Sequence, residues 1–250
     1  NYWSEAINNY LQPHAMLFTG YAILLYVIIR WHEEQKMKWV VFGGLIMGWM
    51  ILSRPSDIIS LLLPFLWNVY DKESFLAKVK LLVTNYKQLI VLALSAFVVF
   101  IPQFIYWKIT SGSFIFFSYQ HTEGFDFSNP HLINILFSFK KSLLVYTPMV
   151  IFMIIGLFRL RKNKKAISTA IIVFAAVNFY LLGSWAAWWN GGSFGLRYFA
   201  QSFAVMSIPL GFTVKEILER KLFVKIFSFS IMAVALPFCG TVRGRISSSR

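Results

Sequence analysis

Three tryptophans, three glycines and one arginine lie together in residues 185–199, between two long apolar stretches. Glycines let a loop fold tightly or approach a ligand, and the planar guanidinium of Arg197 suits a phosphate or a carboxylate. Tryptophans also gather at the headgroup level of a membrane, so an aromatic belt around a tight turn is the alternative interpretation. We favour an anion site, because a belt explains the tryptophans better than it explains the glycines beside Arg197.

The composition predicts an all-α, polytopic transmembrane helical bundle. Hydrophobic residues make up 58% of the 250 residues and charged residues only 14%, whereas soluble domains carry about 25% charged residues. A membrane-crossing helix needs about 20 mostly apolar residues. We expect one multi-span membrane domain over residues 1–250, with about eight spans at 14–29, 39–53, 57–70, 89–107, 143–158, 166–184, 199–214 and 223–240.

The positive charge is concentrated in alternate loops between these predicted spans. Residues 30–38, 71–88, 159–165 and 215–225 hold three, four, five and four of the 24 lysines and arginines. Short cytoplasmic loops carry such an excess, so these loops are predicted to be cytoplasmic. The net charge of +14 is then explained by the orientation of these loops in the membrane. Because this explanation is sufficient, no nucleic-acid partner is expected.

The opposite, non-cytoplasmic face then receives the unusual residues. The loop at about 108–142 is long enough to expect a function or an interfacial helix, and residues 131–139 suit a short amphipathic helix in the interface. This loop contains His121, Glu123 and Asp126, although an ordinary solvated loop would carry such residues too. On the same face, Ser56 or Asp57 is expected to cap the helix after Pro55.

Other signals narrow the setting. The single Cys239 excludes an intrachain disulfide. The absence of an Asn-x-Ser/Thr sequon favours a bacterial membrane. The chain starts at Asn1 in a polar, non-cytoplasmic segment with no span before it, so we expect a fragment with at least one span upstream.

Four stretches resemble the GT-C superfamily of membrane glycosyltransferases, which includes protein O-mannosyltransferases and lipid A aminoarabinose transferases. Residues 12–14 (Gln-Pro-His) are similar to a span start in bacterial members, and residues 43–56 to a Gly-Leu-x-x-Gly … Arg/Lys-Pro-Thr pattern. Residues 124–148 are similar to an outer loop and helix start. Residues 188–198 are similar to a Trp-Trp-Gly-Gly-x-Ser-Phe-Gly-x-Arg-Tyr loop, the most specific of the four.

The resemblance implies inverting transfer of a sugar from a polyprenyl-phosphate donor to a lipid, glycan or protein acceptor. It places the reaction on the outer face of the bacterial inner membrane, with a carboxylate as base or as ligand of an optional divalent metal. Fixed cations stabilise the leaving phosphate: Arg197 first, then Arg54, Lys140 and Lys141. The remaining residues of the expected donor and acceptor cleft are His14, His121, Glu123, Asp126, Trp189 and Tyr198.

The chain departs from the superfamily pattern at one point, and several of the residues have alternative explanations. The superfamily carries its essential acid in the first outer loop, which is absent here, so we expect the base upstream of Asn1 and no activity from this chain alone. Arg54 could instead snorkel at a span end, Lys140 and Lys141 could anchor a helix in the interface, and His14 could bond across helices. As whole functions, a transporter or lipid flippase and a non-catalytic assembly subunit are the alternatives.

Overall fold

The computed structural model describes residues 13–116, 124–189, 195–220 and residue 230. Within these residues the chain is helical and forms no strand, which confirms the predicted all-α class. The predicted site residues His121 and Glu123, and the predicted span 223–240, lie outside the described residues.

Three described helices are long and apolar enough to cross a membrane. They are α2 (His14–Glu34), α6 (Tyr86–Ser111) and α10 (Lys165–Gly183). The fold therefore agrees with an integral membrane protein, and three of the eight predicted spans meet the length required for a crossing.

The other predicted spans form shorter helices. Residues 37–66 make a hairpin in which α3 (Met37–Ser53) is followed by the 3-10 helix η1 (Pro55–Leu61) and by α4 (Leu62–Leu66). The predicted span 143–158 is divided into α8 (Leu143–Tyr146) and α9 (Met149–Asn163), and the span 199–214 corresponds to η2 (Arg197–Phe199) and α11 (Phe203–Leu218).

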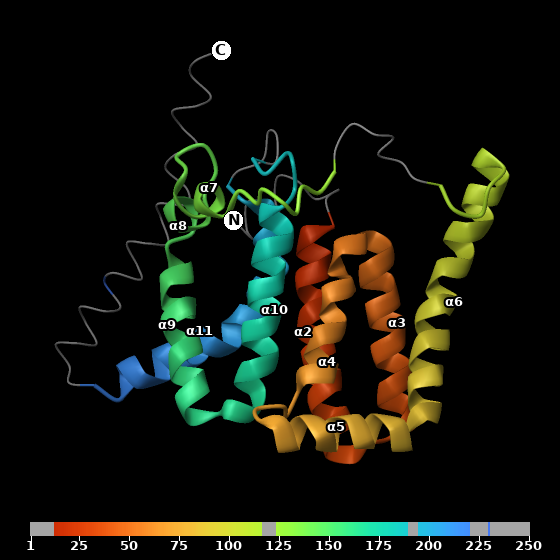
Figure 1. Cartoon of the computed structure of the whole chain (residues 1–250), viewed down its shortest axis with the longest axis horizontal. Helices are drawn as coiled ribbons and strands as arrows, with labels where there is room; N and C mark the ends of the chain where they lie inside the picture. Colours follow the sequence, from red (N-terminus) through yellow and green to blue (C-terminus); the bar gives the residue numbers. More distant parts are fainter. Residues whose placement is uncertain (1–12, 117–123, 190–194, 221–229, 231–250) are drawn as a thin grey trace, which may run out of the picture.

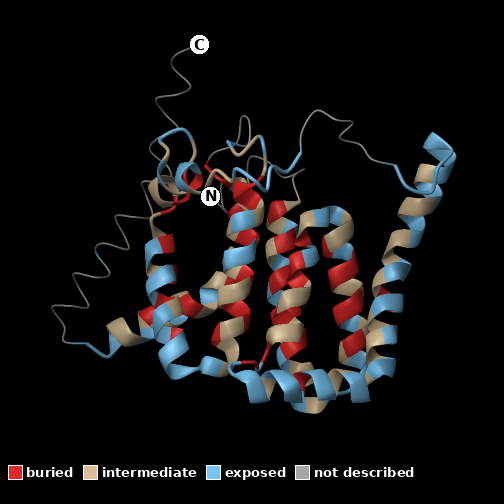
Figure 2. Cartoon of the chain, viewed as in Figure 1, coloured by how far each residue is buried: buried red, intermediate tan, exposed pale blue. Residues whose placement is uncertain are grey.

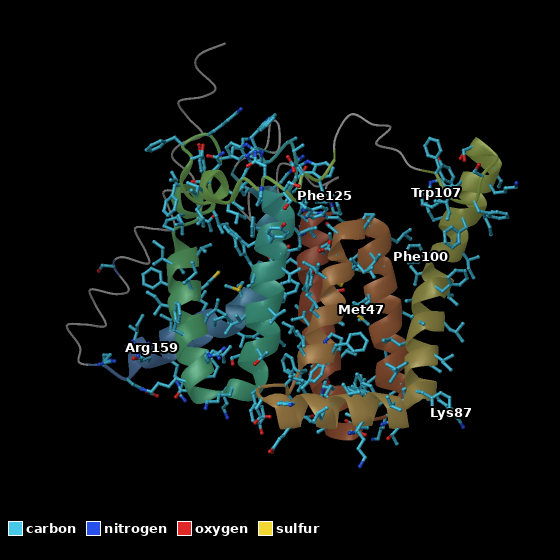
Figure 3. The ribbon with its side chains drawn as sticks, in the orientation of Figure 1. Met47, Lys87, Phe100, Trp107, Phe125 and Arg159 are labelled. Carbon is cyan, nitrogen blue, oxygen red and sulfur yellow. The ribbon has the colours of Figure 1, made fainter. Side chains whose placement is uncertain are left out.

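The bundle has two distinct ends (Figure 1). We call one the loop end: it holds the turn at Arg54 and the segments 124–131, 184–189 and 195–199. We call the other the basic end: it holds the α2–α3 turn, residues 163–165 and the helix α5 (Lys72–Thr84). Phe125 lies at the loop end and Lys87 at the basic end (Figure 3). The predicted amphipathic segment 131–139 forms α7 (Leu132–Phe137) at the loop end.

Glycines allow two pairs of helices to approach closely. A Cβ atom on Gly48 of α3 would lie 2.9 Å from the Cα atom of Ala96 in α6, and one on Gly44 would overlap the Ser95 side chain. Small residues of this kind let helix backbones pack directly in membranes. Gly156 gives α9 the same contact with α11.

The buried core surrounds α2 and α10, while α6 is mostly exposed along its length (Figure 2). Tyr21 of α2 and Phe174 of α10 are both fully buried and meet edge to face, with ring centroids 5.4 Å apart. Such aromatic pairs add to the free energy gained from burial alone. This central contact holds the helices whose loop-end residues form the candidate site.

Candidate functional site

Two arginines meet at the ring of Tyr198. The Cζ atom of Arg54 lies 4.5 Å from the centre of this ring, and that of Arg197 lies 5.5 Å from it. Arg54 also donates from Nη1 to the main-chain oxygen of Tyr198 over 3.3 Å. Three residues predicted from the sequence therefore form one cationic cluster at the loop end.

Arg197 is held by the backbone on either side of it. Gly195 has φ = +61°, in the left-handed region that favours glycine, and its carbonyl accepts from the Arg197 N–H over 3.2 Å. Leu196 and Phe199 are buried, so η2 is anchored in the core. The Nε atom of Arg197 is itself buried and has no hydrogen-bond partner among the described residues, which leaves one donor of the guanidinium unused.

His14, the first residue of α2, belongs to the same cluster. Its side chain is buried, and Nδ1 lies 3.1 Å from Oε1 of Gln201. Because an amide oxygen only accepts, Nδ1 carries the hydrogen in this arrangement. The His14 ring centroid is 5.6 Å from that of Tyr198. His14 thus bonds across helices and also borders the arginines.

Asp57 is a member of the cluster that the sequence reasoning missed. The predicted capping role is wrong: no side chain caps η1, and the Asp57 carboxylate accepts from the Tyr21 hydroxyl over 2.8 Å. Asp57 is only 2% exposed, and both Arg54 and the Gln201 amide act on it. One signal was available, since Asp57 is the single acid in the apolar stretch 37–70, and such residues are usually functional.

Asp126, in contrast, has a structural role. Its Oδ1 accepts from the backbone N–H groups of Ser128 and Asn129, at 3.0 and 3.2 Å, which shapes a turn. The Asp126 N–H donates to the Ser184 carbonyl over 2.7 Å. Tyr180 of α10 donates to the carbonyl next to Asp126, that of Phe127, over 2.7 Å. The turn is therefore fastened to the end of α10, and Asp126 does not contact either arginine.

Lys140 and Trp189 form a separate cation–aromatic contact at the loop end. The Nζ atom of Lys140 lies 4.5 Å from the Trp189 ring centroid, and Trp188 packs edge to face against Trp189. No described contact joins Lys140 to Arg54 or Arg197. The predicted phosphate-binding cations therefore lie in two places: Arg54 and Arg197 contact Tyr198, whereas Lys140 contacts Trp189.

Within the described residues, no group of three or more His, Cys, Asp or Glu side chains could hold a metal ion. No family model, curated protein or solved structure matches the chain. The observations define an all-helical protein with three helices able to span a membrane, and with a buried polar cluster at one end of its bundle.

Proposed function

We propose that the chain belongs to a membrane glycosyltransferase that moves a sugar from a polyprenyl-phosphate donor to a lipid, glycan or protein acceptor. In this proposal Arg54 and Arg197 hold the donor phosphate, and the loop end faces outward from the bacterial inner membrane. One observation carries the proposal: two guanidinium groups from distant segments converge on Tyr198. Arginine forks recognise phosphate oxygens, so a bound phosphate would suit a site at which two guanidiniums meet.

The chemistry requires a cationic site at the leaving group. The acceptor oxygen forms a bond to the anomeric carbon while the bond from that carbon to the phosphate oxygen breaks. The acceptor proton passes to a base, and the departing phosphate gains negative charge. Fixed donors aimed at that charge stabilise the transition state, and arginine forks match phosphate oxygens in geometry. The Arg197 side chain is half-buried rather than buried, and its Nε has no hydrogen-bond partner among the described residues, so the fold leaves part of this guanidinium without a partner.

Asp57 has a different role in this proposal. Its carboxylate is buried, accepts from Tyr21 and lies in the field of Arg54. A base must reach the acceptor proton, and a side chain this buried is poorly placed to do so. We therefore assign Asp57 to balancing the charge of Arg54.

An apolar cavity beside the cluster supports a lipid-linked donor. It has a volume of about 360 Å³ and lies between α9, α10 and α11, lined by residues that include Val150, Phe179 and Met206. Phe199 and Ser202 also line it. Phe199 is two residues after Arg197 in the same 3-10 helix, so the cavity lies close to the arginine. A polyprenyl chain is wholly apolar and fits such a lining.

The test is sugar transfer by the complete protein in membranes, comparing Arg197→Ala and Arg54→Ala with Lys108→Ala. Lys108 is an exposed cation of α6 that donates to the Gly112 carbonyl, away from the cluster. Loss of either arginine is expected to slow transfer roughly 10²- to 10³-fold, with membrane insertion unchanged. Wild-type turnover by Arg197→Ala would refute the assignment, and an equal loss in Lys108→Ala would make the effect non-specific.

A transporter is the second candidate, and Asp57 is the observation in its favour. An ionisable residue on a broken helix is common in transporters, and Asp57 lies on η1, where the α3–α4 hairpin departs from α-helical geometry. Solute or lipid flux in proteoliposomes, abolished by Asp57→Asn, would favour this function over transfer. A non-catalytic assembly subunit would use small residues to pack against other chains, but Gly44 and Gly48 pack against α6 of this chain, so they do not support that alternative.

A further inference from the structure

Residues 71–88, expected to be a basic loop, contain the helix α5. It runs across the ends of α4, α2 and α3 at the basic end of the bundle (Figure 1). Asp71 caps its start: the carboxylate accepts from the Ser74 N–H over 2.7 Å, and the Ser74 hydroxyl oxygen accepts from the Asp71 N–H over 3.0 Å. This capping box fixes where the helix begins.

Lys78 fastens the inner face of α5 to the bundle. Its side chain is buried, and Nζ lies 2.6 Å from Nε2 of His32 and 3.3 Å from the Pro64 carbonyl. The Nδ1 atom of His32 lies 2.7 Å from the Ile28 carbonyl. A carbonyl only accepts, so Nδ1 carries the hydrogen and Nε2 accepts from Lys78. These bonds fix which face of α5 points away from the protein.

That outward face is apolar. Phe75, Leu76, Val79 and Val83 are 49%, 57%, 41% and 66% exposed. Their spacing places them on one stripe of a helix. Tyrosines flank the stripe: Tyr70 precedes α5 and Tyr86 follows it, each 54% exposed, as is typical of residues at headgroup level.

Exposed lysines accompany this apolar stripe. Lys72 and Lys80 are exposed on α5, and Lys87 follows at the start of α6. Helices that lie in the membrane interface combine an apolar face with lysines, and bind more strongly where anionic lipids are present. The stripe, the flanking tyrosines and the lysines thus fit an anionic lipid surface.

We propose that α5 is an interfacial helix that binds anionic phospholipids in the leaflet at the basic end. Phe75, Leu76, Val79 and Val83 lie among the upper acyl chains, and Lys72 and Lys80 contact the lipid phosphates. The proposal does not depend on glycosyl transfer, and it adds a lipid-selective surface at the end of the bundle opposite the arginines.

The test measures the surroundings of a fluorescent probe in the full chain, reconstituted in phosphatidylcholine vesicles that contain phosphatidylglycerol. Cys239, the one cysteine, is changed to Ser, and an environment-sensitive label is attached to Leu76→Cys or to Ala77→Cys. Leu76 lies on the apolar stripe, while Ala77 is exposed on the polar side of the same turn. Nitroxide quenchers are carried either by phosphatidylglycerol or by phosphatidylcholine at equal mole fraction.

The label at Leu76 is expected to be quenched by lipid nitroxides and the label at Ala77 to remain exposed to water. Phosphatidylglycerol nitroxide should quench the label at Leu76 more than phosphatidylcholine nitroxide does, and Lys72→Gln with Lys80→Gln should remove that difference. Equal exposure of both labels to water would overturn the interfacial position. Equal quenching by both lipids would overturn the anionic preference. Shielding at Leu76 that disappears when the protein is diluted in excess lipid would indicate a second copy of the chain instead.

Discussion

The guanidinium of Arg54 lies 4.5 Å from the centre of the Tyr198 ring, with Arg197 on the same ring at 5.5 Å. The ring therefore serves as a shared platform for two cations, one from the turn after α3 and one from η2. Each guanidinium is attracted by the face of the aromatic ring, while the cations repel each other. This balance makes Tyr198 the natural place to begin testing the cluster.

Tyr198→Ala should weaken donor binding, whereas Tyr198→Phe should keep it. The ring attracts the guanidiniums, and a cation–π contact is worth about 0.5–2 kcal/mol. We expect a rise in the donor KM of roughly 2- to 30-fold for Tyr198→Ala and little change for Tyr198→Phe, measured by transfer kinetics in the complete protein. An equal loss in both variants would assign the effect to the hydroxyl group and contradict the platform.

Removing the Tyr21 hydroxyl should destabilise the bundle. Tyr21→Phe leaves Asp57 without the donor that lies 2.8 Å away, and a buried group left unpaired costs about 1–3 kcal/mol. Thermal unfolding in detergent should show the loss. In the Asp57→Asn background, Tyr21→Phe should cost less, because leaving a neutral amide without its hydrogen-bond donor is less unfavourable than leaving a carboxylate without it. Purely additive losses would show that the two side chains do not interact.

Gly48→Ala should weaken the packing of α3 on α6, because the added Cβ would lie 2.9 Å from the Ala96 Cα atom. Gly211→Ala is the matched control: Gly211 also lies in a helix, α11, but its Cβ would meet nothing within 4 Å. Overpacking typically costs about 1–3 kcal/mol, whereas an unobstructed Gly-to-Ala change in a helix is neutral or stabilising. Unfolding midpoints should therefore fall for Gly48→Ala and hold or rise for Gly211→Ala.

The stability of the protein should rise with pH above about 8 because of Lys78. Burial lowers the pKa of Lys78 from 10.5 to about 8. Between these values the unfolded chain binds a proton that the folded chain does not, so the free energy of unfolding increases with pH across this window. Below about pH 8 both states are protonated, and holding the charge in the fold is unfavourable.

Lys78→Gln should remove this rise, while Lys80→Gln, at an exposed position on the same helix, should leave it in place. Unfolding midpoints measured from pH 7 to pH 10.5 provide the comparison. A slope that persists unchanged in Lys78→Gln would show that another group titrates in this range.

Much of the helical framework was predictable because a span is a local property of the chain. The predicted stretches 14–29, 89–107 and 166–184 became α2, α6 and α10, since a continuous apolar run satisfies its own backbone hydrogen bonds as a helix. The short amphipathic segment after His131 was also predictable, as α7.

The stretch 71–88 was less well predicted. Its four lysines indicated a basic loop, yet it contains α5. Along the sequence the apolar residues of this helix alternate with lysines, which hides the apolar stripe. The capping pair Asp71 and Ser74 was the local signal that could have identified the helix.

Local sequence therefore determined which segments are helical, and the run of glycines and tryptophans indicated Arg197 as a candidate. Only tertiary structure brought Arg54 and His14 to the ring of Tyr198, beside Arg197, and only packing buried Asp57 against Tyr21. The physical reason is that helix formation depends on neighbours in sequence. Partners in a buried polar cluster are set by how separate helices pack, and no spacing along the chain encodes that arrangement.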